Sequence, residues 1–161
     1  MDDLKNKVHY IAVTGIVRKD NKFLICKRSQ NERIFPNKWC VPGGGITQDD
    51  FVHTPKDTRD HWFSVFEKAL KREIQEETNI HIKNIRYVSN LVFLRPNGFS
   101  TIIVSMHADW ESGSVVMNQP DELVEYAWVT LEEAKKYDLI ENIYEQMEIV
   151  STMQGGLSGA R

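Results

Sequence analysis

Residues 72–80 read Arg-Glu-Ile-Gln-Glu-Glu-Thr-Asn-Ile, and this stretch is the most informative in the chain. Apolar residues in and before it recur at spacings of three and four: Phe63, Phe66, Leu70 and Ile74. The spacing predicts an amphipathic helix from about residue 61 to residue 78. On such a helix Glu73, Glu76 and Glu77 stand at i, i+3 and i+4, so the three carboxylates lie on one face.

Three carboxylates on one helical face repel each other, and each close pair costs a few tenths of a kcal/mol even when exposed. An ordinary surface helix would interleave lysines, whereas the intervening residues here are Ile74 and Gln75. We expect the repulsion to raise the pKa values of the glutamates. Convergent carboxylates suit hard divalent cations, and Mg²⁺ in particular takes oxygen ligands. A solvated acidic face is the alternative interpretation.

The segments before the helix have strand and turn character. Residues 8–18 and 23–27 are rich in β-branched and aromatic residues, and a polar turn joins them, which predicts a hairpin. A short apolar run, Trp39-Cys40-Val41, then ends in Pro42-Gly43-Gly44-Gly45. Three consecutive glycines allow the backbone to turn sharply or to approach another group closely.

After the helix the chain alternates again between strand and helix patterns. Asn79 stands where a left-handed residue often ends a helix. The strand patterns cover residues 85–93, 99–108 and 126–130, and the helical patterns cover residues 131–134 and 140–150. The order of strands, helix, strands and helix predicts a mixed α/β sandwich.

The glycine run followed by the acidic helix resembles the Nudix box, Gly-x5-Glu-x7-Arg-Glu-U-x-Glu-Glu-x-Gly-U, where U is aliphatic. The second half of this pattern matches at six positions: Arg72, Glu73, Ile74, Glu76, Glu77 and Ile80. Outside the box, Lys27-Arg28, Trp39 and Trp128-Val129 are also similar to the family. The resemblance implies an α/β (α+β) fold, a Nudix-like α/β/α sandwich with a mixed β-sheet. It implies one domain over residues 1–150. The Gly/Ser-rich composition of the last residues separately predicts a disordered tail over residues 151–161.

The chain departs from the family pattern in two places. Nineteen residues separate Gly44 from the position that precedes Arg72 by eight, where the pattern has five, so we expect a 14-residue insertion at about residues 46–60. That position is Ser64, where the family has glutamate. Three nearby acids are candidate substitutes: Asp57, Asp60 and Glu67. The second departure is Asn79 in place of glycine, which a left-handed helix cap explains.

The resemblance implies hydrolysis of a phosphoanhydride bond in a nucleoside diphosphate linked to another moiety, as in a nucleoside triphosphate or an ADP-sugar. It implies Mg²⁺ or Mn²⁺, held by Glu73, Glu76, Glu77 and the Gly43 carbonyl. The same three glutamates and Arg72 are then the catalytic candidates, with Arg72 orienting the glutamates through charge-assisted hydrogen bonds.

The residues that contact the substrate are less clearly marked than the metal site. The candidates are Lys27, Arg28, Trp39 and Glu122. Basic residues on a hairpin are more often plain surface, and aromatic residues in strands are more often core. The carboxylate that accepts the proton of the attacking water is one of the helix glutamates or one of Asp121, Glu122 and Glu125. The insertion is either a specificity lid or decoration.

Two other functions stay open at this point. One is a non-catalytic Nudix-fold module that binds a nucleotide or a partner protein, and Ser64 is its only support. The other is an acidic calcium-binding or partner-binding surface on an unrelated α+β domain. The three glutamates count against the first hypothesis, and the Gly43-Gly44 turn counts against the second.

Composition narrows the choice of partners. The chain has 161 residues and a formal net charge of −3, so no overall basic field exists to hold a nucleic acid polymer. No apolar run approaches the roughly 20 residues that span a bilayer, and residues 1–7 do not resemble a signal peptide. Cys26 and Cys40 are predicted to be buried thiols. We therefore expect a cytoplasmic protein with a nucleotide-type small-molecule substrate, and both a monomer and a homodimer stay open.

Overall fold

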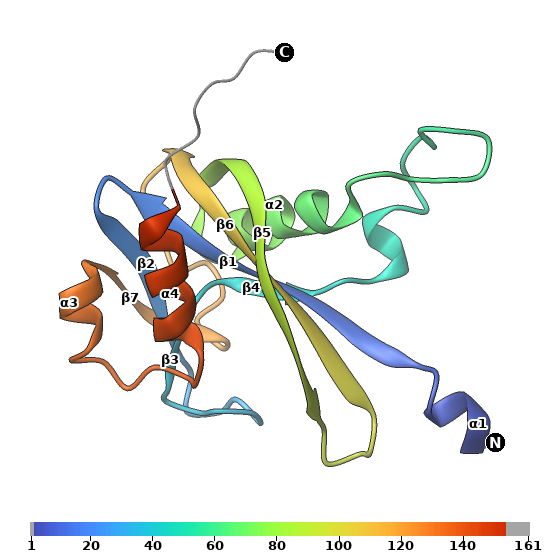
Figure 1. Cartoon of the computed structure of the whole chain (residues 1–161), viewed down its shortest axis with the longest axis horizontal. Coiled ribbons are helices and arrows are strands. Elements are labelled where there is room, and N and C mark those ends of the chain that lie inside the picture. The colour runs from blue at the N-terminus through green and yellow to red at the C-terminus, as the bar shows by residue number, and fades with distance from the viewer. Residues whose placement is uncertain (1, 154–161) are drawn as a thin grey trace.

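The computed structural model describes residues 2–153, which form one mixed sheet with helices packed on it (Figure 1). The strands are β1 (His9–Lys19), β2 (Lys22–Arg28), β3 (Trp39–Cys40), β4 (Gly43–Gly45), β5 (His81–Leu94), β6 (Ser100–Ser112) and β7 (Leu123–Val129). The helices are α1 (Asp2–Lys5), the short 3₁₀ helix η1 (Gln48–Asp50), α2 (Val65–Thr78), α3 (Leu131–Ala134) and α4 (Ile143–Thr152).

The strand β1 is the centre of the sheet. The path of neighbouring strands is β3-β2-β1-β6-β5, with β4 paired to β1 and β7 paired to β2. The β1–β6 pair is parallel and the other pairs are antiparallel, which confirms the predicted mixed sheet. Two strands share one edge of β1, because β2 pairs with its end and β4 pairs with its middle. The glycine strand β4 is thereby placed beside Val13, which is fully buried.

Helices cover both faces of β1. A Cβ added to Gly15 would lie 2.7 Å from the Cδ1 atom of Ile74, so α2 packs directly against the β1 backbone. Arg18 points to the opposite face, since successive residues of a strand alternate, and its Nη1 donates to the Met153 carbonyl at the end of α4. The α/β/α arrangement expected from the sequence is therefore present (Figure 1).

The helix α2 begins later than its apolar spacing predicts. It starts at Val65 rather than near residue 61, and Phe63 precedes it with 54% of its surface exposed. The cause is local, because the Phe63 amide donates to Asp57 Oδ2 at 2.8 Å and the Asp57 amide donates to the His61 carbonyl. The end of α2 is as predicted, with Asn79 in the left-handed region at φ 61°.

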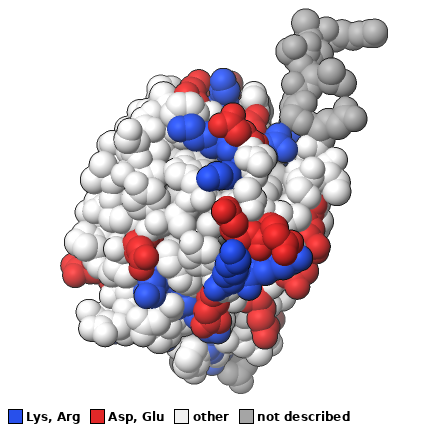
Figure 2. All heavy atoms as spheres, turned by 90° about the vertical axis from the view of Figure 1, so that its left-hand side faces the viewer, with Lys and Arg blue, Asp and Glu red and all other residues white. Residues whose placement is uncertain are grey.

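The C-terminal boundary and the cysteines complete the description. The helix α4 continues to Thr152, two residues past the expected domain boundary, and the rest of the expected tail, residues 154–161, lies outside the described residues. Both cysteines are buried free thiols, as predicted, and burial raises the pKa of Cys40 to about 12. No helix within residues 2–153 has the length and apolar character needed to cross a membrane. On the face drawn in Figure 2, basic and acidic side chains are interspersed.

Candidate active site

The glycine strand β4 lies against α2 at van der Waals distance. Its residues pair antiparallel with β1, Gly44 opposite Val13 and Gly43 opposite Thr14. A Cβ on Gly44 would lie 2.3–2.5 Å from the carboxylate atoms of Glu73, and a Cβ on Gly43 would lie 2.1 Å from the Val13 carbonyl oxygen. Only a residue without a side chain allows both approaches. The glycine run is therefore what lets a strand backbone meet the acidic face of α2.

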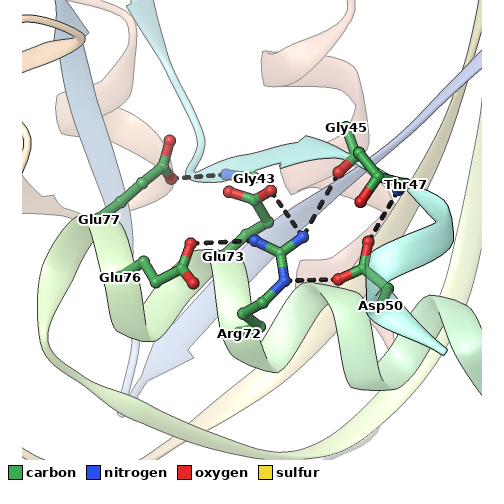
Figure 3. Close-up of polar contacts among 8 residues, drawn as sticks. All are labelled: Gly43, Gly45, Thr47, Asp50, Arg72, Glu73, Glu76 and Glu77. Atoms are coloured by element: carbon green, nitrogen blue, oxygen red, sulfur yellow. Dashed lines mark hydrogen bonds and ion pairs between the residues drawn. The ribbon is translucent and has the colours of Figure 1, made fainter. Parts of the chain in front are cut away.

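Glu77 is a buried carboxylate at the end of this contact. Its surface is only 4% exposed, and the Gly43 amide donates to its Oε2 at 2.9 Å (Figure 3). Burial raises the pKa of Glu77 to about 8, the Gly43 hydrogen bond opposes the rise, and the nearby charges of Glu73 and Glu122 add to it. The sequence predicts a raised pKa for Glu77 from repulsion between carboxylates, whereas burial is the larger cause here.

Glu73 and Glu76 differ in how far they reach solvent. The Glu73 side chain is 14% exposed beneath β4, and burial raises its pKa although the charge of Arg72 opposes the rise. The Glu76 side chain, one turn further along α2, is 47% exposed. The helix thus presents Glu73 at the glycine strand (Figure 3) and Glu76 at the surface.

Arg72 joins the acidic groups of the site. Its Nη1 donates to Glu76 Oε2 at 2.9 Å, its Nη2 lies 3.0 Å from Glu73 Oε1, and its Nε donates to Asp50 Oδ1 at 2.5 Å. The first two contacts are the charge-assisted pairs that the sequence predicts for Arg72. Asp50, the last residue of η1, was not among the predicted site residues. Its spacing of six positions from Gly44 is the signal that would have found it.

The candidate residues for substrate binding fall into two groups. Arg28 and Glu122 lie close enough to Glu77 to influence its pKa, Arg28 lowering it and Glu122 raising it. Arg28 also donates to Glu32 Oε2 at 2.7 Å and to the Ile34 carbonyl at 2.9 Å. The structure therefore gathers Arg28 and Glu122 at the buried end of the carboxylate row.

The other two candidates lie elsewhere in the sheet. Trp39 is only 9% exposed and packs edge-on against the Tyr137 ring, with 4.8 Å between ring centroids. Lys27 lies across from Glu125 in the β2–β7 pair, with Nζ 3.8 Å from Oε2. Trp39 thus has the contacts of a core residue, and Lys27 has those of a strand-surface ion pair.

The donor set fits a hard divalent cation. Carboxylate and carbonyl oxygens are the ligands that Mg²⁺ and Mn²⁺ take, and burial raises the pKa values of Glu73 and Glu77. Within residues 2–153 no three carboxylate, imidazole or thiol side chains are already grouped as a metal cluster. The carboxylate oxygens of Glu76 and Glu73 are directed at Arg72, and an oxygen of Glu77 accepts from the Gly43 amide (Figure 3).

A strand of glycines against an acidic helix, within an α/β/α sandwich, is the arrangement that the Nudix box encodes. A family model described as a NUDIX domain matches residues 8–148, which is most of the chain. The chain therefore belongs to the Nudix family and is a Nudix-type pyrophosphohydrolase.

Relatives in sequence carry a more specific name. The chain is 27% identical over 135 residues to the nucleoside triphosphatase NudI of Klebsiella pneumoniae (strain 342), a match that covers 79% of this chain and 86% of that protein. It is 28% identical over 142 residues to NudI of Salmonella newport (strain SL254), with the same two coverages.

Solved structures share the fold. The MutT Nudix hydrolase of Burkholderia pseudomallei has a TM-score of 0.70 at 20% identity and covers 89% of this chain and 98% of its own. The Nudix domain of Shewanella oneidensis NrtR, solved with ADP ribose, has a TM-score of 0.66 at 15% identity and covers 89% of this chain and 86% of its own. At such identities the likeness confirms the architecture.

Proposed function

We propose that this protein hydrolyses a phosphoanhydride bond in a nucleoside diphosphate linked to another moiety, with Mg²⁺ or Mn²⁺ as cofactor. The observation that carries the proposal is the contact of β4 with α2, where Gly44 leaves room for the Glu73 carboxylate and the Gly43 amide binds Glu77. Nucleoside triphosphates are the preferred substrate class, because the relatives in sequence are named as nucleoside triphosphatases. ADP-sugars are the second class to test.

The residues that would hold the cation are Glu73, Glu76, Glu77 and the Gly43 carbonyl. When bound, a divalent cation neutralises charge on phosphate oxygens and lowers the pKa of a water molecule. Two of the glutamates, Glu73 and Glu77, are partly or fully buried, and burial disfavours their ionised forms and raises their pKa values. A bound cation would therefore further stabilise the ionised form of these two carboxylates.

Arg72 keeps the glutamates in position. It binds Glu76 and Glu73 at the same time, at 2.9 Å and 3.0 Å. Such charge-assisted pairs hold side chains in one orientation, and misplacing a catalytic group by about 1 Å can cost about 10²-fold in rate. In the proposed reaction Arg72 therefore acts on the glutamates and does not contact the substrate.

Glu122 is the proposed acceptor of the proton from the attacking water. Of the three later acids, it is the one whose charge contributes to the raised pKa of Glu77, whereas Glu125 lies 3.8 Å from Lys27. Its side chain is exposed, so it can return the proton to solvent. Arg28, whose charge also influences the pKa of Glu77, is the proposed contact for a substrate phosphate, because a guanidinium matches phosphate oxygens in geometry and charge.

A substrate screen tests the function directly. Nucleoside triphosphates and ADP-sugars are incubated with Mg²⁺, with Mn²⁺ and with chelator, and released phosphate and pyrophosphate are measured separately. We expect turnover with metal, none with chelator, and turnover lower by about 10²-fold or more in Glu77→Gln. Binding of a nucleotide without any product in all three conditions would support the non-catalytic module instead.

A further inference from the structure

The first acidic position of the Nudix box falls on different residues according to the direction of counting. Counting forward from Gly44 through five residues leads to Asp50, and counting back from Arg72 leads to Ser64. The two positions are 14 residues apart (64 − 50), which is the length of the insertion. The side chains of these two residues have different contacts, which decide between them.

Within residues 2–153 no hydrogen bond joins the Ser64 side chain to the glutamates of α2. It is the N-cap of α2, in the left-handed region at φ 54°, and its side chain makes no capping hydrogen bond. Asp50 is held on both carboxylate oxygens, because Oδ1 accepts from Arg72 Nε at 2.5 Å and Oδ2 accepts from the Thr47 amide at 2.8 Å. Its side chain is 3% exposed, compared with 36% for Arg72.

We propose that Asp50 holds the first acidic position of the motif and acts as a positioning residue through Arg72. The inserted segment is then residues 51–64, which follow the acidic position and do not displace it. This role rests on the proposed hydrolase function, since it concerns the orientation of Glu73 and Glu76 in that reaction.

The geometry explains why Arg72 needs this third partner. A guanidinium has three nitrogens, and with Nε on Asp50 the two Nη groups are left for Glu76 and Glu73. The Asp50 carboxylate is tied to the sheet through Thr47, because the Thr47 amide donates to Asp50 and the amide of the preceding residue, Ile46, donates to the Ile11 carbonyl of β1 at 2.8 Å. Without Asp50 the guanidinium is free to rotate about its side chain, and both glutamates lose a fixed partner.

Asp57 offers a matched control within the insertion. Its Oδ2 accepts from the Phe63 amide at 2.8 Å and lies 3.7 Å from Lys68 Nζ on α2. Like Asp50, it both caps backbone and pairs with a basic residue of α2, but its partner is not Arg72. If these substitutions act only by loosening the inserted segment, Asp57→Asn and Asp50→Asn should lower kcat equally.

The kinetic test compares Asp50→Asn, Asp57→Asn, Asp50→Glu, Arg72→Gln and the double variant Asp50→Asn/Arg72→Gln. We expect Asp50→Asn to lower kcat by about 10-fold or more with KM changed less than about threefold, as loss of positioning predicts. Asp57→Asn should stay within about twofold of the unaltered protein. If Asp50 acts through Arg72, the double variant should be no slower than Arg72→Gln alone, because residues of one network are not additive.

A second measurement does not depend on turnover. The Arg72 Nε–H should exchange slowly with solvent by NMR, stay slow in Asp57→Asn and become fast in Asp50→Asn. If the protein hydrolyses no nucleotide, the proposed function fails while this measurement still tests the contact. Equal kinetic losses in Asp50→Asn and Asp57→Asn, or independent multiplication of losses in the double variant, would overturn the role of Asp50. Asp50→Glu keeps the charge and completes the test should Asp50→Asn not fold, and a tenfold fall in its kcat would also count against the role.

Discussion

The helix α2 and the segment of residues 46–64 both supply carboxylates to Arg72, and they do so by different means. In α2 the helical repeat alone brings Glu73 and Glu76 to the same face as Arg72. In the segment, Asp50 reaches Arg72 from 22 residues away in sequence, through a loop conformation. A regular element can thus be placed from its periodicity, whereas a loop contact depends on the folded path of the chain.

The two regions are also stabilised differently. The inner face of α2 buries Leu70 and Ile74 completely, and full burial of such side chains contributes roughly 1.5–3 kcal/mol each. The helix η1 contributes no residue to the buried core, although the Asp50 side chain is only 3% exposed. The segment is held by polar contacts such as that of Trp62 Nε1 with the Thr54 carbonyl at 3.0 Å. Local opening should therefore begin in the segment while α2 stays formed.

The largest effect should come from the acidic face of α2. We expect Glu76→Gln and Glu77→Gln each to lower kcat by about 10²-fold or more at saturating metal, because an amide keeps the volume but binds Mg²⁺ poorly. Folding should be little changed. Glu67→Gln, on the first turn of the same helix, is the control and should retain normal turnover. Steady-state rates near normal in both site variants would exclude a metal site on α2.

A second prediction separates the role of the two neighbouring glycines of β4. In Gly44→Ala the new Cβ would lie 2.3–2.5 Å from the Glu73 carboxylate, which must move, whereas in Gly45→Ala the nearest atom is the Ile11 carbonyl oxygen at 4.0 Å. The displaced group is the end of a flexible side chain, so stability should change little in both.

We therefore expect kcat to fall by about 10-fold or more in Gly44→Ala, the size of effect that misplaced groups produce, and to stay near normal in Gly45→Ala. Melting temperature and kcat, measured together for both variants, separate a loss of activity from a loss of stability. Equal activity in the two variants would mean that the close approach of β4 to Glu73 has no part in catalysis.

Much of this site follows from sequence, and the reasons are specific. The positions of Glu73, Glu76 and Glu77 follow from helical geometry, and the Asn79 cap follows from the need for a left-handed residue. The start of α2 did not follow, because Phe63 continues the apolar spacing although the Asp57 side chain and backbone hold it outside the helix.

The substrate-contact candidates show the same division. Arg28 and Trp39 lie on adjacent strands, and the sequence gives no reason to prefer either as a substrate contact. In the structure Arg28 lies near Glu77, whereas Trp39 packs on Tyr137. Which side of the sheet a side chain meets depends on pairing register, and that is set by contacts distant in sequence. Asp50 has the motif spacing from Gly44, but its contact with Arg72, 22 residues away, depends on the fold of a loop and could not be predicted from the sequence.

The third prediction separates the role of Asp50 from that of the residues that follow it in the segment. Replacing residues 52–61 with a short Gly/Ser linker keeps Asp50 and should leave a folded protein, because loop length changes closure entropy only as about (3/2)RT ln n. We expect kcat within about threefold and a several-fold change in KM or in substrate preference. Deleting residues 48–58 removes Asp50 as well and should lower kcat further. Unchanged kinetics on the best substrate in the first variant would mean that residues 52–61 have no part in substrate binding or preference.

The smallest effect concerns stability and pH in the metal-free protein. Burial raises the pKa of Glu77 from 4.5 to about 8, so between these values the folded state keeps a proton that the unfolded chain has released. The resulting stability is fully present below pH 4.5 and is lost as pH rises to about 8. His107, whose pKa burial lowers, acts in the opposite direction, but it is present in every variant and cancels in a comparison.

Glu77→Gln removes the titration of this group. In chelator its melting temperature minus that of the unaltered protein should therefore grow from pH 5 to pH 8 by several degrees. One pKa unit corresponds to about 1.4 kcal/mol, and about 1 kcal/mol shifts the melting temperature of a domain this size by roughly 2–4 °C. Glu76→Gln, whose side chain is 47% exposed, controls for the loss of a glutamate as such.

Mg²⁺ should reverse the deficit at pH 8 in the unaltered protein alone, because a cation that binds only the folded state adds RT ln(1 + [L]/Kd), about 2.7 kcal/mol at 100 Kd. Thermal shift series in chelator and in Mg²⁺, at pH 5 and pH 8, measure both effects. If the difference between Glu77→Gln and the unaltered protein is the same at both pH values, Glu77 does not carry a buried, uncompensated charge. If Mg²⁺ stabilises both proteins equally, the cation binds somewhere other than the contact of β4 with α2.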